Sequence, residues 1–133
     1  MRVFFILVAF VISFSSNAQE EYTVLIDNEN VIISYQILEV KKKGALIPEI
    51  RLSIQNKSEQ LVEVSFELIL RYDMEAAEAT EVSRICIGAE KTKKGKIKGL
   101  FYNPETLTIS QLNSEDFELY LDELKVVNVA KCK

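Results

Sequence analysis

VEVSFELILRY, residues 62–72, alternates apolar and polar side chains. Every second residue from Val62 to Tyr72 is apolar, and most of the residues between them carry a charge or a hydroxyl group. A surface helix would repeat its apolar residues every three to four positions, so a period of two indicates a β-strand. One buried face and one wet face are typical of strands in antiparallel sheets.

The same alternation continues on both sides of this stretch. It recurs most clearly at residues 33–37 and 50–55, and turn residues such as DNEN (27–30), KKKGA (41–45) and NKSEQ (56–60) separate the stretches. NKSEQ predicts a hairpin between two strong strands. Further strands are expected at residues 22–26, 84–88, 98–102, 105–112 and 116–121. Seven or eight short strands predict an all-β, antiparallel, two-sheet β-sandwich.

Two segments leave alternatives open. From residue 117 to 129 the apolar positions shift from odd to even numbers and back. Asp122-Glu123 is then either a tight hairpin turn or part of one long bulged strand. The bulged strand is favoured, because this pair lacks the glycine that such turns prefer. DMEAAEA, residues 73–79, is rich in alanine and glutamate and predicts a single helical turn.

LTISQLNSEDFELYL, residues 107–121, resembles the E–F region of fibronectin type III and immunoglobulin-like domains. In those domains an apolar strand leads to a corner leucine and then to a strand that begins with an aromatic residue. Ile109, Leu112, Phe117, Leu119 and Leu121 stand at the comparable places. The resemblance implies an immunoglobulin-like sandwich, although the chain has no tryptophan and its cysteines lie elsewhere.

The first residues have the pattern of a secretory signal peptide. Arg2 precedes an apolar run over residues 3–14, and Ser16-Asn17-Ala18 supplies a small-x-small cleavage site. The alternative, a membrane anchor, would need about 20 apolar residues. The exit SNAQ resembles signal peptides of Gram-negative bacteria. We therefore expect a signal peptide at residues 1–18 and one β-sandwich domain at residues 19–133.

The cleaved product is expected to be exported, to the periplasm or the medium. No second apolar run in the sequence is long enough to span a bilayer, so no membrane-spanning segment is expected after cleavage. The chain is acidic, with a formal net charge of −4, which does not favour nucleic acid as a partner.

Two cysteines, Cys86 and Cys132, make an even count in an exported chain. They predict a disulfide that fastens the C-terminus to the strand containing Cys86. Closing a loop of about 46 residues would stabilise the fold by about 4 kcal/mol in the chain-entropy model. Two free thiols, or a link to another chain, are the alternatives.

Residue types that carry chemistry are scarce. The chain has no histidine, the commonest general base and zinc ligand, and its four glycines form no phosphate-binding loop. No cofactor or metal is expected. DNEN could offer oxygen ligands to calcium, but four residues fall short of its coordination shell, and a turn is the favoured interpretation. Asn56-Lys57-Ser58 fits the glycosylation pattern, which matters only in a eukaryotic host.

The most conspicuous cluster is basic. It consists of Lys91, Lys93, Lys94, Lys96 and Lys98. If the backbone is extended here, Lys94, Lys96 and Lys98 share one face that could meet an anionic glycan, lipid headgroups or an acidic protein. The same lysines could instead protect a strand edge from aggregation. No aromatic residues are interleaved with them, which disfavours single-stranded nucleic acid.

These observations predict an exported, non-enzymatic binding or structural module of the cell envelope. Its partner would be an envelope protein, an extracellular protein or a glycan. One alternative is a small inhibitor of a secreted hydrolase that uses the lysine loop at residues 91–98. A second is a carboxylate-dependent enzyme, which would need two acids in one pocket.

Overall fold

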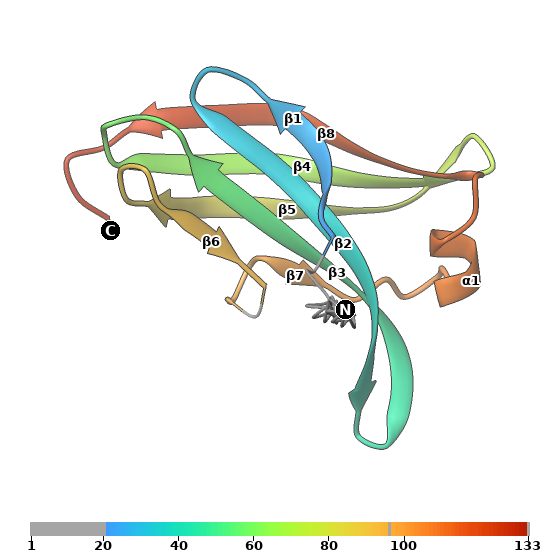
Figure 1. Ribbon diagram of the computed structural model, residues 1–133. Coiled ribbons are helices and arrows are strands. Elements are labelled where there is room, and N and C mark those ends of the chain that lie inside the picture. The colour runs from blue at the N-terminus through green and yellow to red at the C-terminus, as the bar shows by residue number, and fades with distance from the viewer. Residues whose placement is uncertain (1–20, 96, 133) are drawn as a thin grey trace, which may run out of the picture.

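Two antiparallel sheets face each other (Figure 1). The computed structural model describes residues 21–95 and 97–132, so the predicted signal peptide lies outside the described residues. The larger sheet has the order β1-β2-β3-β6 with β7 also paired to β3, and the smaller has the order β5-β4-β8. The strands are β1 (Thr23–Asp27), β2 (Val31–Lys42), β3 (Ala45–Asn56), β4 (Val62–Tyr72), β5 (Glu75–Ile87), β6 (Thr92–Lys94), β7 (Phe101–Tyr102) and β8 (Phe117–Asn128). The predicted all-β, two-sheet arrangement is confirmed as an open, sandwich-like fold.

The hydrophobic core lies between the sheets. β4 is the central strand of the smaller sheet, and its alternate residues are buried, with Phe66 only 2% exposed. β2 and β3 contribute the opposite wall, which consists of Val31, Ile33, Ile50, Leu52 and Ile54. Burying each large apolar side chain is worth about 1.5–3 kcal/mol. The period of two in residues 62–72 therefore reflects this inner face, as predicted.

The turn after β3 is not a hairpin, and that prediction is wrong. β3 and β4 lie in different sheets, so residues 57–61 cross from one sheet to the other. Asn56 organises the crossing and is fully buried. Its Nδ2 donates to the carbonyls of Gln60 (2.7 Å) and Ile87 (3.1 Å), and its Oδ1 accepts from Ser58 N (2.9 Å). A fully bonded, buried amide is a structural group and does not present a glycosylation site.

Residues 73–79 do not form the predicted helical turn. Asp73 and Met74 have φ angles of 51° and 66° and form a two-residue turn, after which β5 begins at Glu75. Turns of this type need positive φ at both central residues and match the twist of paired strands. The local helix preference of alanine and glutamate is overridden by pairing of β5 along the whole of β4.

β8 is one long strand with a bulge, as favoured from the sequence. Its register against β4 shifts between Ser65 and Glu67, where Glu123 has a φ of 52°. The bulge moves the inward-facing set of residues from odd to even positions. The hairpin alternative at Asp122-Glu123 is excluded, because residues 117–128 all belong to β8.

The C-terminal segment is fastened as predicted. Val129 N donates to Leu61 O (3.0 Å), which continues the pairing of β8 with β4 by one residue, and the chain then crosses the end of β4 (Figure 1). Cys132 then forms a disulfide with Cys86 of β5, with the Cα atoms 5.7 Å apart. β5 and β8 are the two edge strands of the smaller sheet, and the disulfide ties the tail of one to the other.

The segment between β6 and β8 contains less strand than predicted. The expected strand at residues 98–102 is reduced to β7, which pairs with Ile50 and Arg51 of β3. The expected strand at residues 105–112 is wrong, because its last residues form a short helix, α1 (Ile109–Leu112). A capping box explains this helix: Thr108 Oγ1 accepts from Gln111 N, and Gln111 Oε1 accepts from Thr108 N.

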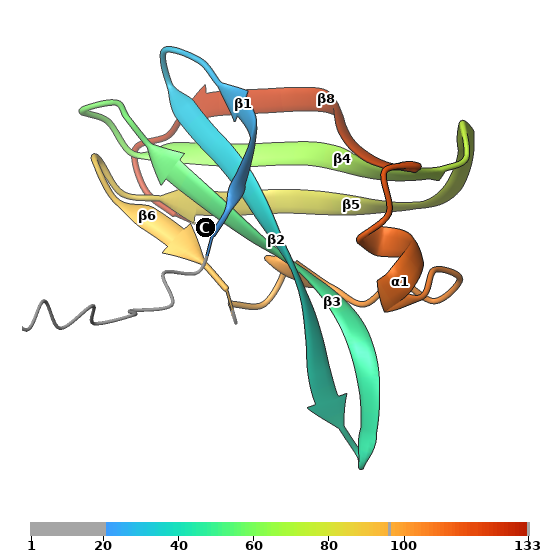
Figure 2. The same ribbon diagram turned by 45° about the vertical axis from the view of Figure 1, so that its right-hand side comes forward.

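The β2–β3 hairpin extends well beyond the rest of the larger sheet. We call residues 36–49 the arm and the remainder of the described chain the body. In both views the end of the arm projects away from the smaller sheet (Figures 1 and 2). Lys43 and Gly44, with φ angles of 48° and 79°, form its two-residue turn. β1 pairs only with Ile32–Tyr35 of β2, so along the arm β2 has a strand partner on one side only.

Candidate functional site

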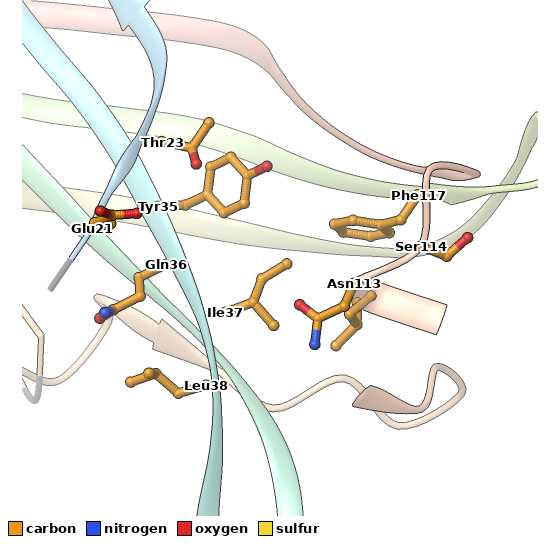
Figure 3. Close-up of a pocket in the computed structure, with 10 residues that line it drawn as sticks. Glu21, Thr23, Tyr35, Gln36, Ile37, Leu38, Asn113, Ser114 and Phe117 are labelled. Carbon is orange, nitrogen blue, oxygen red and sulfur yellow. The ribbon is translucent and has the colours of Figure 1, made fainter. Parts of the chain in front are cut away.

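A groove of about 660 Å³ lies where β1 leaves β2 uncovered. Tyr35 and Ile37 of β2 form one wall, and Phe117 and Asn113 come from the side of α1 and β8 (Figure 3). Leu112, which is buried at the end of α1, also lines the groove. The groove is therefore an open side of the sandwich, flanked by strand, helix and loop.

The point at which β1 begins explains why the groove is open. Thr23, the first residue of β1, lies opposite Tyr35. The ring of Tyr22 lies 5.9 Å from Lys94 Nζ, and Lys94 is in β6 at the far side of the same sheet. Tyr22 thus lies over the outer face of the larger sheet, and the pairing of β1 with β2 begins at Thr23.

Polar and apolar residues line the groove in equal number: Glu21, Thr23, Gln36, Asn113 and Ser114 are polar, and Tyr35, Ile37, Leu38, Leu112 and Phe117 are apolar. Glu21 is the one charged residue among the described residues that line it. A concave site that combines apolar side chains with polar groups is typical of a binding site.

The edge of β2 next to the groove presents free backbone groups. Leu52, opposite Tyr35, directs its N–H to Leu100 O (2.8 Å) and accepts from Gly95 N (3.2 Å), so both of its groups point away from β2. In an antiparallel pair, directly opposite residues either exchange both hydrogen bonds or none. Tyr35 therefore points its backbone groups away from β3, toward β1. By alternation Ile37, Glu39 and Lys41 do the same, where β1 is absent.

A buried carboxylate holds the base of the arm. Glu49 is only 4% exposed and accepts from Arg51 Nε (2.7 Å), while Asn103 Nδ2 donates to Pro48 O (3.1 Å) and to Glu49 Oε1 (3.3 Å). Burial opposes ionisation of Glu49, but these hydrogen bonds and the nearby Arg51 and Lys42 charges outweigh it and lower its pKa. Lys42 Nζ completes the cluster by donating to Asn103 Oδ1 (2.8 Å).

A second carboxylate links the two sheets. Glu78 of β5 accepts from Tyr102 OH (2.7 Å), Glu105 N (2.8 Å) and both N and Oγ1 of Thr106 (3.2 and 2.9 Å). Burial opposes its ionisation, yet these hydrogen bonds prevail and lower the pKa of Glu78. Burial and the Glu78 carboxylate together raise the pKa of Tyr102. Both Glu49 and Glu78 are thus ionised structural groups.

The structure spreads the predicted lysine cluster over different surroundings. Lys93 lies opposite Ile54 and Lys94 opposite Ser53, so these two neighbours point to opposite faces of β6. The strand ends at Lys94, and Lys98 is exposed in the loop that follows. Lys96 lies outside the described residues. Lys91 precedes β6, and its stem packs against Gly88.

A shallow acidic hollow lies on the outer face of the smaller sheet. It measures about 350 Å³ and is lined by Glu67, Glu81, Glu123 and Lys125, among others. In the strand register Glu67 lies directly opposite both Glu81 and Asp122. Glu81 and Glu123 are exposed, so the hollow does not remove these acids from water. Directly opposed like charges destabilise a sheet.

The DNEN segment forms the turn between β1 and β2, as favoured from the sequence. Asn28 Oδ1 accepts from the backbone N–H groups of Asn30 and Val31, both at 2.9 Å. Lys57 Nζ closes the turn from outside by donating to Asp27 Oδ1 (3.0 Å). Within residues 21–95 and 97–132, no group of three or more acidic, histidine or cysteine side chains could hold a metal ion.

Comparison with models of known protein families, with curated proteins and with solved structures finds no match to this chain. No helix in the described part of the chain is long and apolar enough to cross a membrane. The groove, the open edge and the arm are therefore the features from which a function has to be argued.

The structural roles of the Glu49 and Glu78 carboxylates could not be predicted from the sequence. Glu49 and Glu78 stand at ordinary polar positions of alternating or alanine-rich stretches. Their partners, Asn103 and residues 102–106, lie more than twenty positions away in sequence. The groove had one indirect signal, the apolar residues Tyr35, Ile37 and Phe117, but the sequence did not show that they meet.

Proposed function

We propose that this chain is an exported, non-enzymatic binding module of the cell envelope, and that its partner, a protein or a glycan, binds in the groove beside β2. The observation that carries the proposal is the groove itself, with Tyr35, Ile37 and Phe117 half-buried at an open side of the sandwich. Concave, largely preformed and mostly apolar sites are where proteins bind ligands.

The support for a binding role is the way the segments next to the groove are held. Glu78 joins β5 to the loop at residues 102–106, and Glu49 joins the arm to Asn103. Both carboxylates therefore form hydrogen bonds within the protein. A groove between fixed walls loses little conformational entropy when it is filled, which favours binding.

Export rests on the sequence of residues 1–18, with its apolar run and small-x-small exit. The disulfide between Cys86 and Cys132 is in keeping with an oxidising compartment such as the periplasm or the medium. Cell fractionation, with N-terminal sequencing of the mature chain, tests this part. A mature chain that begins at Gln19 supports it, and a cytoplasmic chain that retains Met1 overturns it.

An immunoglobulin-like architecture belongs to the same proposal. Its support is the pair of antiparallel sheets around one core, with Leu112 buried before the aromatic start of β8 at Phe117. The strand that the resemblance requires before Leu112 is replaced by a loop and α1. The proposal therefore concerns architecture and carries no particular activity.

Site-specific photo-crosslinking in living cells tests the groove. A photoreactive amino acid replaces Asn113, which is exposed and lines the groove, and a matched control replaces Ser83, which is exposed on β5. A dominant crosslinked species from position 113 that is absent from position 83 supports the proposal. Equal crosslinking from both positions, or none from position 113, overturns it.

A further inference from the structure

In the outer part of the arm, β2 presents both backbone groups and charged side chains that could bond to another strand. Ile37, Glu39 and Lys41 direct their backbone N–H and C=O groups to the side where β1 is absent, as derived above from the Leu52 hydrogen bonds. These backbone groups have no backbone partner within the described chain. An uncovered row of this kind is a template for pairing with another strand.

The side chains on this edge alternate in charge. Glu39 and Lys41 are both exposed and lie on the same face of β2, because they are two residues apart. Neither forms an ion pair with any described residue, whereas neighbouring Lys42 is engaged by Asn103 and Glu49. If a second copy of this strand pairs with the edge in the antiparallel direction, its Lys41 can lie opposite Glu39 and its Glu39 opposite Lys41. Each charge then has a partner of opposite sign.

We propose that the β2 edge of the arm pairs with the same edge of a second copy of this chain, antiparallel, about a two-fold axis at Val40. Glu39 then lies opposite Lys41 of the second copy, and Lys41 lies opposite Glu39. These positions all point their backbone groups outward, so they form the hydrogen-bonded pairs of the new ladder. Val40 meets Val40 of the second copy as the intervening, closely spaced pair. The contact is isologous, as two-fold symmetry requires.

The other face of the arm fits the same register. Val40 lies opposite Ile47 within the hairpin, and both are half-buried. In the pair of arms these residues become one apolar row across four strands, Ile47–Val40–Val40–Ile47. On the charged face Lys41 lies opposite Leu46, which is 64% exposed, and Glu39 lies opposite Pro48. Each ion pair is thereby flanked by an apolar side chain, which lessens its exposure to water.

Arm-to-arm pairing covers only a few residues on each side, so its area falls below the roughly 1,200 Å² of a stable interface. We therefore expect a dimer that dissociates on dilution. In this register the turn of each arm, Lys43-Gly44, reaches Ile37 of the other copy at the mouth of the groove. The inference goes beyond the proposed function and does not depend on it, because the groove can bind a partner in a monomer.

Sedimentation of the purified mature chain tests the pairing, at concentrations up to about 1 mM, where even an association worth about 4 kcal/mol half-assembles. Glu39→Lys and Lys41→Glu each place like charges opposite one another twice and should weaken the dimer about tenfold or more. The double variant Glu39→Lys/Lys41→Glu restores opposite charges and should restore the dimer. Glu29→Lys and Lys125→Glu are matched exposed controls and should leave it unchanged.

A cysteine scan tests the register. Val40→Cys should form a disulfide-linked dimer under mild oxidation, because the two positions are directly opposed at the axis. Leu38→Cys alone should not, whereas a mixture of Leu38→Cys and Lys42→Cys chains should. A chain that stays monomeric throughout, charge variants that all dimerise equally, or crosslinking of Leu38→Cys as readily as Val40→Cys would each overturn the inference. The photo-crosslinking experiment at position 113 tests the proposed function independently of this dimer.

Discussion

The body and the arm of this protein are built partly from the same two strands, yet they are held in different ways. In the body β2 and β3 are paired on both sides and bury Ile33, Leu52 and Ile54 against the smaller sheet. In the arm the same strands have no facing sheet, and the bonds that Glu49 and Lys42 make with Asn103 anchor them to the body. The comparison shows that one hairpin can form part of the core where another sheet covers it and project from the molecule where no sheet covers it.

The largest expected effect concerns the body. Replacing both Cys86 and Cys132 with serine removes the link between β5 and the tail of β8 and should cost about 2–4 kcal/mol of unfolding free energy. Urea unfolding measures it. Reducing the wild-type chain should produce the same loss, and the arm should be unaffected because the disulfide lies in the smaller sheet. An undiminished unfolding midpoint in the variant would contradict this assignment.

Glu78→Gln should have the next largest effect, about 2 kcal/mol, because the charged acceptor of four hydrogen bonds becomes a neutral amide. It should also change the pH dependence. The folded pKa of Glu78 is lower than its ordinary value of 4.5, so its contribution is complete above that pH and is lost as the pH falls through the folded pKa.

Unfolding measured between about pH 6 and pH 3 checks the sign of this linkage. The wild-type chain should lose stability more steeply than Glu78→Gln over that range. Glu105→Gln is a suitable control, because only the backbone N–H of Glu105 bonds to Glu78. Parallel pH profiles for the wild type and Glu78→Gln would show that Glu78 does not carry the linkage.

Glu49→Gln tests whether the arm opens independently of the body. It keeps the shape of the buried group but removes the charge that binds Arg51 Nε at 2.7 Å, a local loss of about 1 kcal/mol. Amide hydrogen exchange should become faster along residues 38–48 and remain unchanged in β4. Equal acceleration in β4 would mean that the arm and the body open as one unit.

The smallest expected effect is a gain in stability. Glu67 faces both Glu81 and Asp122 across the smaller sheet, so Glu67→Gln should stabilise the chain by a few tenths of a kcal/mol. Glu63→Gln is the matched control, since Glu63 lies opposite Cys86 and Val127 and faces no acid. The gain should shrink at high salt, and a loss of stability instead would assign Glu67 another role.

Elements with a strong, regular pattern were predictable. Residues 62–72 alternate without interruption, and β4 lies there with its apolar side buried. The bulge in β8 was visible as a shift of the apolar positions near Glu123. The helical turn predicted at residues 73–79 was wrong, because the pairing of β5 with β4 outweighs local composition. The strand predicted at residues 105–112 was wrong, because the capping box at Thr108 starts a short helix.

The candidate site was predictable only in its parts. Tyr35, Ile37 and Phe117 could be identified as apolar strand residues, but their meeting depends on where β1 begins and on the path of Tyr22 toward Lys94. The lysine cluster at residues 91–98 was the clearest sequence signal. β6 turns Lys93 and Lys94 to opposite faces and so disperses it.

By itself the sequence determined the class of fold, the estimate of seven or eight strands and the Cys86–Cys132 pair. Side-chain alternation is a local property, and two cysteines allow only one pairing within the chain. Only the tertiary structure decided which strands share a sheet, where β2 stays uncovered, why Glu49 and Asn56 are buried, and which groups bond to Glu78. These outcomes depend on contacts between residues far apart in the chain. Their free energies are realised only when both sheets close on one core.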